Sequence, residues 1–459
     1  MRNSWRATAL VAFFGLCLAC LFGSSPAAAE TGESLRVATF SCNATPPLGE
    51  PLISCDRIGM VEQPLLAKGI VLEADGRRYV LCVIDWCELC NGGHEAFRNT
   101  IAAAANTVPA HVALQTVHQH TAPVVDMDAQ KLLAEAGIAE LMMNPRVFEV
   151  IGQRLADAVR QSLDHLEPFD QVGVGQAKVD RVAATRRPLD ANGKISPRMS
   201  SCADPAVQAL PEGAIDPYLK TITLAKGDKP LVRLHYYATH PQTKYGNGRA
   251  SSDFVGDVRE QVQQKEGVFQ IYFNGCGGDI TVGKYSDGSR KDRDGLTERL
   301  LAGMEAAIAA TKYAPASQVR WRVCPVLFPR RTDANFAPAE CLACMKNAAA
   351  GPVARMYSGG VRSAFHQRSQ KTIELTSLEI GNVSIVHLPG EPMIEFQLFA
   401  QNVKPGAFVA VAGYGDCGTG YICPEKAYSE GGYEPTASAV KPESETLLKK
   451  AISALLGVE

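Results

Sequence analysis

The chain has 459 residues, of which 46 are basic and 48 are acidic, so its formal net charge is −2 at pH 7. This balance, without a basic block or an acidic tail, gives no electrostatic reason to expect nucleic-acid binding. Hydrophobic residues make up 46 % of the chain, which is enough for a packed core and argues against a disordered protein.

The first residues have the organisation of a secretory signal peptide. Arg2 and Arg6 precede an apolar run over residues 7–22, and small residues follow up to Ala29. These small residues have the A-x-A pattern of a cleavage site, so we expect cleavage after Ala29. Because the apolar run is too short for a membrane span, we expect a periplasmic or secreted protein.

Twelve of the fourteen cysteines lie after this leader. An even number of cysteines in an exported chain favours disulfides over thiolate–metal sites. We expect Cys42 to pair with Cys55 and Cys417 with Cys423. Two C-x-x-C segments lack nearby partner histidines, so they are weaker candidates for zinc sites.

The first clear supersecondary unit is strand, helix, strand. Residues 78–86 form a nearly continuous apolar run, typical of a strand buried on both faces. A helical segment over residues 94–106 separates it from an alternating, β-branched strand over residues 112–116. This order predicts a βαβ unit. Asp85 ends the first strand, where it either orients a histidine or, as we favour, caps the following helix.

Two histidines follow the second strand of this unit. His118 and His120 precede Pro123, which prevents simple continuation of the strand. In α/β sheets this carboxyl edge is where sites are built. Two imidazoles two residues apart in extended chain project from the same face, where they can share a metal ion or a substrate. The alternative is a pair of loop histidines bonded to the backbone.

The order of strand, histidine and proline recurs at His240. Residues 219–224 and 231–238 are expected to pair as strands, and His240 and Pro241 follow them. A helix over residues 253–264 and a strand over residues 268–273 are expected next.

A glycine-rich turn over residues 274–281 follows. Because it lacks the lysine and the spacing of a P-loop, we reject a nucleotide site. Its amides either form an oxyanion hole or belong to an ordinary tight turn.

Glu391 lies between a buried strand over residues 383–388 and a helix that begins at Met393. A carboxylate in this place either ligates a metal ion or caps the helix N-terminus. Together the expected elements indicate an α/β fold of mixed β-sheets packed with helices. The remaining elements are helices over residues 146–166, 296–311, 340–350 and 443–456 and a strand over residues 408–412.

Six short motifs are spread in order over most of the chain: His118-Gln119-His120-Thr121-Ala122-Pro123, Thr185-Arg186-Arg187-Pro188, His240-Pro241 with Ser251-Ser252-Asp253, Gly278-Asp279-Ile280-Thr281, Leu388-Pro389-Gly390-Glu391, and Tyr421-Ile422 with Tyr428 and Tyr433-Glu434. They resemble the motifs of the neutral/alkaline ceramidase family. The resemblance implies a single ceramidase-type catalytic domain over residues 30–459, without the C-terminal immunoglobulin-like domain of the family.

The resemblance also implies a zinc site and a set of catalytic residues. Imidazole and carboxylate are ordinary zinc donors, and zinc lowers the pKa of bound water to about 7, which gives a hydroxide that attacks an amide carbonyl. His120 is then expected to assist proton transfer or to bind the oxyanion. The implied zinc ligands are His118, His240, Glu391 and Tyr421, and the implied catalytic residues are His120, Arg186, Thr281 and Tyr433.

Two of these catalytic residues have features of their own. Arg186 is expected to hold the substrate together with Tyr433, and its alternative is a plain salt bridge. The family's serine falls on Thr281, whose hydroxyl can still donate a hydrogen bond.

The expected function is therefore zinc-dependent hydrolysis of N-acyl (amide) bonds outside the cytoplasm, with ceramide or ceramide-like N-acyl lipids as leading substrates. The alternatives are a zinc-dependent hydrolase of another ester or amide, and a secreted, non-catalytic binding protein on the same fold. We expect a small-molecule or lipid substrate and transient contact with a membrane surface. Neither nucleic acid nor a stable protein partner is expected.

Overall fold

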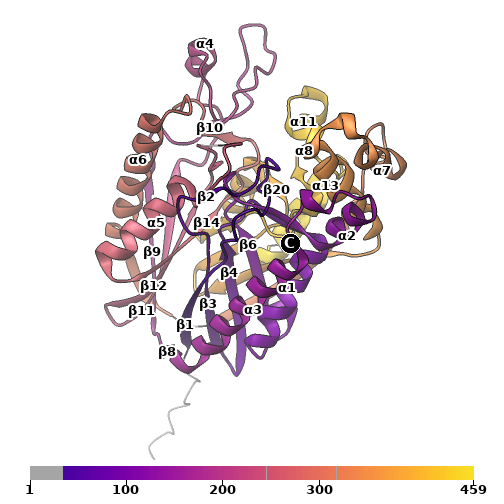
Figure 1. Ribbon diagram of the computed structural model, residues 1–459. Coiled ribbons are helices and arrows are strands. Elements are labelled where there is room, and N and C mark those ends of the chain that lie inside the picture. Colours follow the sequence, from indigo (N-terminus) through magenta and orange to yellow (C-terminus); the bar gives the residue numbers. More distant parts are fainter. Residues whose placement is uncertain (1–34, 244, 317, 459) are drawn as a thin grey trace, which may run out of the picture. The chain divides into compact units, whose positions relative to one another are not determined.

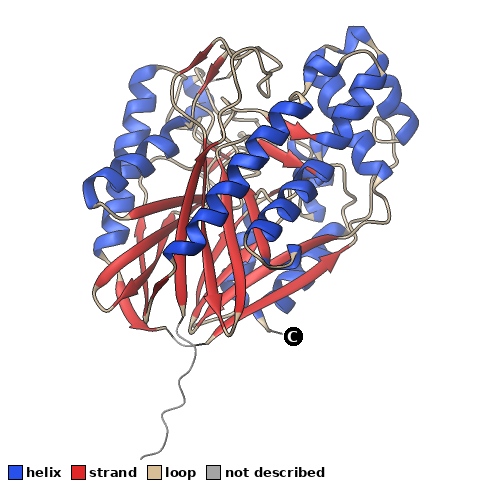
Figure 2. Cartoon of the chain, turned by 60° about the horizontal axis from the view of Figure 1, so that its bottom comes forward, coloured by secondary structure: helices blue, strands red, loops and turns tan. Residues whose placement is uncertain are grey.

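Three mixed β-sheets flanked by helices form the framework of the computed structural model (Figures 1 and 2). The structure describes residues 35–243, 245–316 and 318–458, which belong to one unit, Glu33–Glu459. The predicted leader and its cleavage site at Ala29 lie outside the described residues. The α/β fold class with mixed sheets is the one that the sequence predicts.

The first sheet has the strand order β6-β4-β3-β1-β8 and contains the predicted βαβ unit. β4 and β6 run parallel and are joined by α1, whereas β1, β3 and β4 are antiparallel neighbours. Val80 and Ile84 of β4 pack in the core with α1 and α3, and Leu81 and Val83 pack in the core shared with the second sheet. Burial of both faces explains the continuous apolar sequence of β4. The elements are β1 (Arg36–Asn43), β3 (Leu66–Ala74), β4 (Arg77–Ile84), α1 (Asn91–Ala104), β6 (Val112–Thr116), α3 (Pro145–Ser162) and β8 (Glu167–Pro168).

The second sheet has the order β14-β12-β11-β9-β16. β12 and β14 are parallel and joined by α5, and α6 packs against β9 and β11. A Cβ atom at Gly175 of β9 would lie 2.1 Å from the carbonyl oxygen of Ala307, so the close approach of α6 to the sheet requires glycine at this position. The elements are β9 (Gln171–Lys178), β11 (Tyr218–Lys226), β12 (Lys229–Tyr237), α5 (Asp253–Glu266), β14 (Phe269–Asn274), α6 (Arg290–Ala309) and β16 (Lys312–Pro315).

The third sheet has the order β17-β18-β19-β21, and it is covered by α10 and α13. β19 and β21 are parallel and joined by α10, so each of the three sheets contains one βαβ unit. The elements are β17 (Val319–Val326), β18 (Ile373–Ile380), β19 (Val383–His387), α10 (Ile394–Val403), β21 (Phe408–Ala412) and α13 (Ser444–Leu456).

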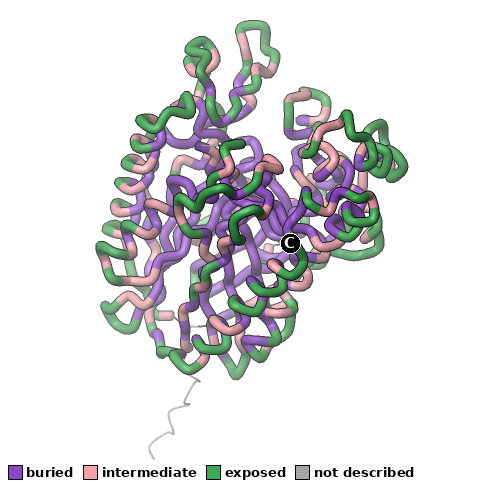
Figure 3. Tube along the Cα trace, in the orientation of Figure 1, coloured by how far each residue is buried: buried purple, intermediate pink, exposed green. Residues whose placement is uncertain are grey.

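The parallel strand pairs of these three sheets, β4–β6, β12–β14 and β19–β21, lie next to one another. β14 contacts β4, β6 and β21, and β12 also contacts β21. The buried residues accordingly run through the centre of the unit, and the exposed residues lie on the peripheral loops and helices (Figure 3). Residues that directly follow β6, β12, β14 and β19 are therefore brought together at one edge.

A group of helices between β17 and β18, here called the helical lobe, packs against α2 (Met127–Glu135). It consists of α7 (Pro338–Lys346), α8 (Pro352–Ala354), the π-helix η5 (Arg355–Val361) and α9 (Arg362–Gln367). The remaining elements are β2 (Met60–Val61), β5 (Glu88–Cys90), η1 (Pro109–His111), β7 (Val124–Asp126), η2 (Ala139–Leu141), η3 (Leu163–His165), β10 (Ala184–Thr185), α4 (Pro205–Ala209), β13 (Arg249–Ala250), β15 (Ile280–Thr281), η4 (Ala348–Ala350), β20 (Glu391–Pro392), η6 (Cys417–Thr419), β22 (Tyr421–Ile422), α11 (Glu425–Glu430) and α12 (Glu434–Ala437).

The expected disulfides are not formed. All twelve cysteines in the described part of the chain are free thiols. Cys55 Sγ lies against Met356 Sδ. Cys417 Sγ donates to the carbonyl of Gly415 and packs in the core that contains α1 and α3, whereas Cys423 packs in a separate small cluster with Tyr421. Cys417 and Cys423 therefore lie in different surroundings, whereas Cys42 and Cys55 pack against the same core as free thiols.

Within the described residues, no helix combines the length and the apolar character that crossing a membrane requires.

Candidate active site

A cavity of about 730 Å³ lies at the edge where the three parallel strand pairs end. Part of its wall comes from the helical lobe and the turn before α8, by way of residues 350–354, 357, 358, 361 and 362. The structure brings seven of the eight predicted site residues to this cavity: His118, His120, Arg186, His240, Glu391, Tyr421 and Tyr433. The eighth, Thr281, is not among the residues that line it.

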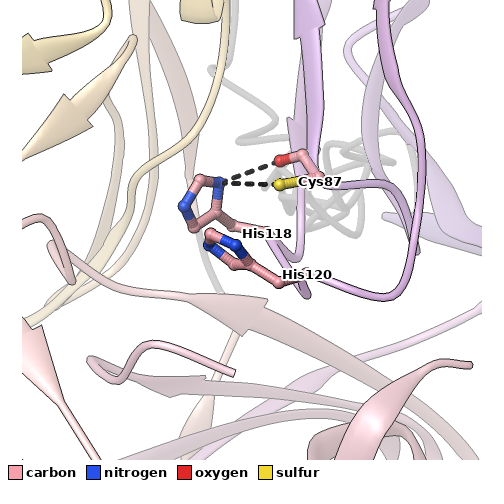
Figure 4. A group of neighbouring side chains, drawn as sticks. All are labelled: Cys87, His118 and His120. Carbon is pink, nitrogen blue, oxygen red and sulfur yellow. Dashed lines mark hydrogen bonds between the residues drawn. The ribbon is translucent and has the colours of Figure 1, made fainter. Parts of the chain in front are cut away.

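His118 leaves the extended conformation of β6. Its φ is +67°, in the left-handed region that few non-glycine residues adopt. Its N–H donates to the carbonyl of Trp86, and its ring Nδ1 lies 3.0 Å from the carbonyl oxygen of Cys87 (Figure 4). The expectation that both histidines project from an extended strand is therefore wrong, because the strand ends at Thr116. The rings of His118 and His120 instead stand nearly perpendicular, at 86°.

The hydrogen bond to the carbonyl of Cys87 orients the ring of His118. Since Nδ1–H donates, Nε2 is the ring nitrogen that faces Glu391. Nε2 lies 2.9 Å from Oε2 of Glu391, yet neither atom has a hydrogen-bond partner. Both side chains are buried, so Nε2 and the carboxylate oxygen approach this closely only with a cation between them, either a proton or a metal ion. These two side chains therefore have the arrangement of metal ligands.

His240, which follows β12, repeats this arrangement. Its Nδ1 lies 3.2 Å from the carbonyl oxygen of Gly277, which leaves Nε2 to face the cavity, 2.8 Å from Nε2 of His120. Ligand atoms of His118, His240 and Glu391 all lie within 4.8 Å of one another. Burial lowers the pKa of His120 and His240 well below the usual value, and neighbouring positive groups act in the same direction. Both rings are therefore neutral at pH 7, the form that binds a metal ion.

Cys87 forms a second group of potential ligands with His118 and His120 (Figure 4). Its Sγ lies 3.7 Å from Nδ1 of His118. Burial, followed by the charges of Glu88 and Glu391, raises the pKa of this thiol well above its usual value. Because the thiolate is the form that binds metals, the contribution of Cys87 is its backbone carbonyl rather than its sulfur.

Glu391 and Tyr421 are brought together by pairing between short strands. β20 and β22 are parallel, and the register sets Glu391 opposite Tyr421. The alternative role for Glu391, capping the next helix, belongs to Asp279, whose Oδ1 accepts the N–H of Ile394 at 2.8 Å. This division leaves the carboxylate of Glu391 free to face His118.

Arg186 joins the two predicted tyrosines. Its Nη1 donates to Oη of Tyr421 at 2.9 Å, and its guanidinium lies over the rings of Tyr421 and Tyr433, 5.9 and 5.8 Å from their centroids. Its Nε lies 3.9 Å from Oε1 of the buried Glu434. Burial raises the pKa of Tyr421 well above its usual value, and the charge of Arg186 opposes this shift. Arg186 thus makes an ion-pair contact with Glu434 and donates a hydrogen bond to Tyr421, a predicted zinc ligand.

The glycine-rich turn is an ordinary tight turn rather than an oxyanion hole. A Cβ atom at Gly277 would lie 2.3 Å from the carbonyl oxygen of Thr239, and one at Gly278 would lie 2.6 Å from that of Glu391. Glycines here allow the turn to touch the segments that carry His240 and Glu391. Four of its amides already donate within the protein, to Tyr237 O, Gln397 Oε1, Pro392 O and Gly277 O, from Gly275, Cys276, Gly278 and Ile280 respectively.

Thr281 lies in β15 instead of at the cavity. Its Oγ1 accepts the N–H of Gly283 at 3.0 Å, and its side chain is fully buried. β15 pairs with β10, and the N–H of Arg186 donates to the carbonyl of Asp279 next to this pair. In this structure Thr281 therefore supports the segment that carries Arg186.

Asp85 has neither of the two roles considered for it. Its two carboxylate oxygens accept hydrogen bonds from Arg259 at 2.7 and 2.9 Å, and one also accepts the N–H of Leu66. Both charged side chains are 1 % exposed. The expectation of a helix cap is wrong, because the carboxylate of Asp85 instead accepts hydrogen bonds from the buried guanidinium of Arg259 in α5.

Glu88 lines the cavity and was not expected from the sequence. It is 2 % exposed, and burial, followed by the charge of Glu391, raises its pKa well above the usual value. The signal that points to it is a carboxylate within the apolar stretch Trp86-Cys87-Glu88-Leu89-Cys90. Such a residue is seldom buried without a partner.

No family model and no curated protein sequence matches the chain significantly, but solved structures do. A neutral ceramidase from Pseudomonas aeruginosa matches with a TM-score of 0.68 at 13 % identity, over 93 % of this chain and 75 % of that one. A ceramidase complexed with C2 matches with a TM-score of 0.67 at 14 % identity, over 93 % of this chain and 76 % of that one. The chain, whose six short motifs resemble those of the ceramidase family, therefore has the fold of neutral ceramidase structures.

Proposed function

We propose that the protein is a zinc-dependent hydrolase of N-acyl (amide) bonds. The observation that carries the proposal is the convergence of His118, His240 and Glu391 at the wall of the cavity, with two buried ligand atoms that no hydrogen bond satisfies. Two neutral imidazoles and a carboxylate are a common donor set for catalytic zinc. Tyr421, held opposite Glu391, is the fourth protein ligand in the proposal.

The remaining cavity residues have the positions that amide hydrolysis needs. His120 is neutral, and its Nε2 lies beside His240 while its buried Nδ1 has no partner, so it can accept a proton and pass it on. Arg186 and Tyr433 hold the substrate carbonyl near the ligand set. The zinc ion supplies the Lewis acidity that makes water nucleophilic at neutral pH.

Ceramide and ceramide-like N-acyl lipids are the leading substrates. The short motifs and the ceramidase fold support this choice, and the cavity volume of about 730 Å³ is in the range of small-molecule sites. In this proposal the protein is exported, contacts membranes only transiently, and needs no stable protein partner. Hydrolysis of another ester or amide is the second candidate, because the same ligand set serves both.

The first test is the metal content of the purified protein. We expect about one zinc ion per chain in the wild type, and loss of most of it in His118→Ala and Glu391→Ala, because each change removes one of few donors. His165→Ala and Glu149→Ala are matched controls, since both residues are exposed on other parts of the surface, and both variants should keep the metal.

The metal-loaded protein is then assayed against ceramides and simpler N-acyl amides. Hydrolysis by the wild type and the controls, but not by the two ligand variants, supports the proposal. A wild type without metal, or metal retained in both ligand variants, refutes it. A zinc-bound protein that hydrolyses no N-acyl amide or ester would be the non-catalytic binding protein.

A further inference from the structure

Arg362 is a cation at the cavity wall without a carboxylate partner in the described part of the chain. It begins α9, directly after the π-helix. Its Nη2 donates to the carbonyl of Thr436 at 3.0 Å, and its guanidinium lies 4.3 Å from the ring centroid of Phe336. A single neutral acceptor leaves most of its five N–H donors free for a ligand.

Two neighbouring arginines have carboxylate partners, whereas Arg362 has none among the described residues. Arg186, also at the cavity wall, contacts Glu434 and Tyr421, and Arg331 donates to Asp333 at 2.9 Å. Burial lowers the pKa of Arg362, and the charge of Arg331 acts in the same direction. A guanidinium in such a place is stabilised when an anion binds to it.

The rest of the wall shows what else a ligand must contain. The helical lobe contributes small and apolar residues to the same cavity as Arg362, including Val353, Ala354 and Val361. The carboxylates that line the cavity, Glu88 and Glu391, lie at the proposed metal end. An anion is therefore favoured only at the Arg362 end, beside an apolar surface.

Two tyrosines connect this cation with the proposed metal ligands. The rings of Tyr421 and Tyr433 lie 5.7 Å apart in an edge-on contact, and both tyrosines line the same cavity as Arg362. A single small substrate can therefore reach from the ligand set, past Tyr433, to Arg362.

We infer that Arg362 binds the carboxylate of the substrate, which makes N-acyl amino acids the preferred class of amide. The planar fork of a guanidinium matches a carboxylate, and the apolar wall accommodates the acyl chain. This inference rests on the proposed amide hydrolysis and narrows its substrate to one with an anionic head group. It ranks such substrates ahead of neutral ceramides.

Binding is tested first on metal-free protein, so that no turnover occurs. The probes are N-decanoylglycine and its neutral isostere N-decanoylglycinamide, measured by titration calorimetry. We expect the acid to bind more tightly, and Arg362→Gln to weaken the acid about 10- to 100-fold while leaving the amide unchanged. Arg355→Gln is the matched control, because Arg355 begins the π-helix that precedes Arg362, donates to the carbonyl of Met345 and does not line the cavity.

Hydrolysis of the same two compounds and of a short-chain ceramide is measured with zinc-loaded protein. We expect a higher kcat/KM for the acid, with the effect of Arg362→Gln in KM rather than in kcat. If the wild type hydrolyses the neutral compounds as well as the acid, the inference fails while the proposed function stands. If it hydrolyses none of the three although the acid binds through Arg362, the proposed function fails instead.

Charge reversal separates recognition from a general effect on folding. Arg362→Glu should lose the preference for the acid and gain one for a cationic analogue, N-decanoylethylenediamine, at an unchanged thermal midpoint. Arg362→Lys should retain part of the preference, since it keeps the charge and loses the fork. Equal effects of all three substitutions on acid, amide and cationic analogue would overturn the assignment of Arg362.

Discussion

Backbone carbonyls decide which nitrogen of each site histidine faces the cavity. Cys87 O accepts from Nδ1 of His118, and Gly277 O does the same for His240. Such outer partners orient ligand rings and raise their basicity. A residue can therefore be essential to the geometry through its main chain while its side chain is replaceable.

Cys87 offers a test of this view. We expect Cys87→Ala to keep the full metal content, because the carbonyl that holds His118 remains in place. Its free energy of unfolding should fall by about 1 kcal/mol, since a small buried side chain is lost. Metal content by elemental analysis and unfolding in urea are the two measurements. Loss of the metal in this variant would instead show that the thiolate is a ligand.

At the scale of elements, a buried ion pair ties the end of β4 to α5. Asp85 and Arg259 form two hydrogen bonds at 1 % exposure each, and Asp85 also accepts the N–H of Leu66 at the start of β3. β4 belongs to the first sheet and α5 follows β12 of the second. The pair therefore fixes one βαβ unit against another.

Removal of one partner should be costly, because it leaves a buried charge unpaired. We expect Asp85→Ala to lower the free energy of unfolding by about 3–5 kcal/mol. The double variant Asp85→Leu/Arg259→Met should recover much of this loss. Unfolding in urea is the measurement, and Asp294→Ala, which breaks the exposed pair with Arg290, should leave the midpoint unchanged. Additive losses in the double variant would contradict this account.

Helices and strands with a clear hydrophobic period were predictable from the sequence, whereas contacts between elements far apart in the sequence were not. The apolar run of β4 and the helix before β6 identified the first βαβ unit, and the strand–histidine–proline order located His118 and His240. The partner of Asp85 is a guanidinium far along the chain, and no local pattern announces it. Arg362 reaches the cavity only because the helical lobe folds against α2, so nothing in its own sequence marks it.

At the scale of the whole molecule, two of the buried histidines outside the cavity, His235 and His387, make stability depend on pH. His235 lies in the second sheet, between Thr221 Oγ1 at 2.9 Å and Gln270 Oε1 at 2.7 Å, and His387 lies in the third, 3.0 Å from Thr376 Oγ1. Burial lowers the pKa of His235 to about 4 and that of His387 to about 3. Both rings are neutral in the folded protein under ordinary conditions.

The unfolded chain takes up a proton at each of these histidines at about pH 6.5, whereas the folded chain does not until pH 4 or below. Their stabilising effect is therefore fully present above pH 6.5 and is lost as the pH falls towards 4. Proton uptake by the unfolded chain at each histidine should lower the free energy of unfolding by about 2 kcal/mol by pH 5. Urea unfolding of metal-free protein between pH 7 and 4.5 measures this loss together with that from His94, His120 and His240, whose pKa burial also lowers.

Replacement of one buried histidine checks the assignment. His235→Gln should be less stable at pH 7 but should show a slope smaller by about 1.4 kcal/mol per pH unit between pH 6 and 4.5. His165→Gln, at an exposed position, should keep the wild-type slope. An unchanged slope in His235→Gln would assign the acid sensitivity to other groups.

The proposed ligands follow strands of three different sheets, and long stretches of chain separate them. His118 follows the first sheet, His240 follows β12 of the second, and Glu391 follows β19 of the third. An ion held by all three would close long loops whose entropy the unfolded chain retains. No fragment that lacks one sheet contains the complete ligand set, so capture of the ion would coincide with the docking of the three sheets during folding.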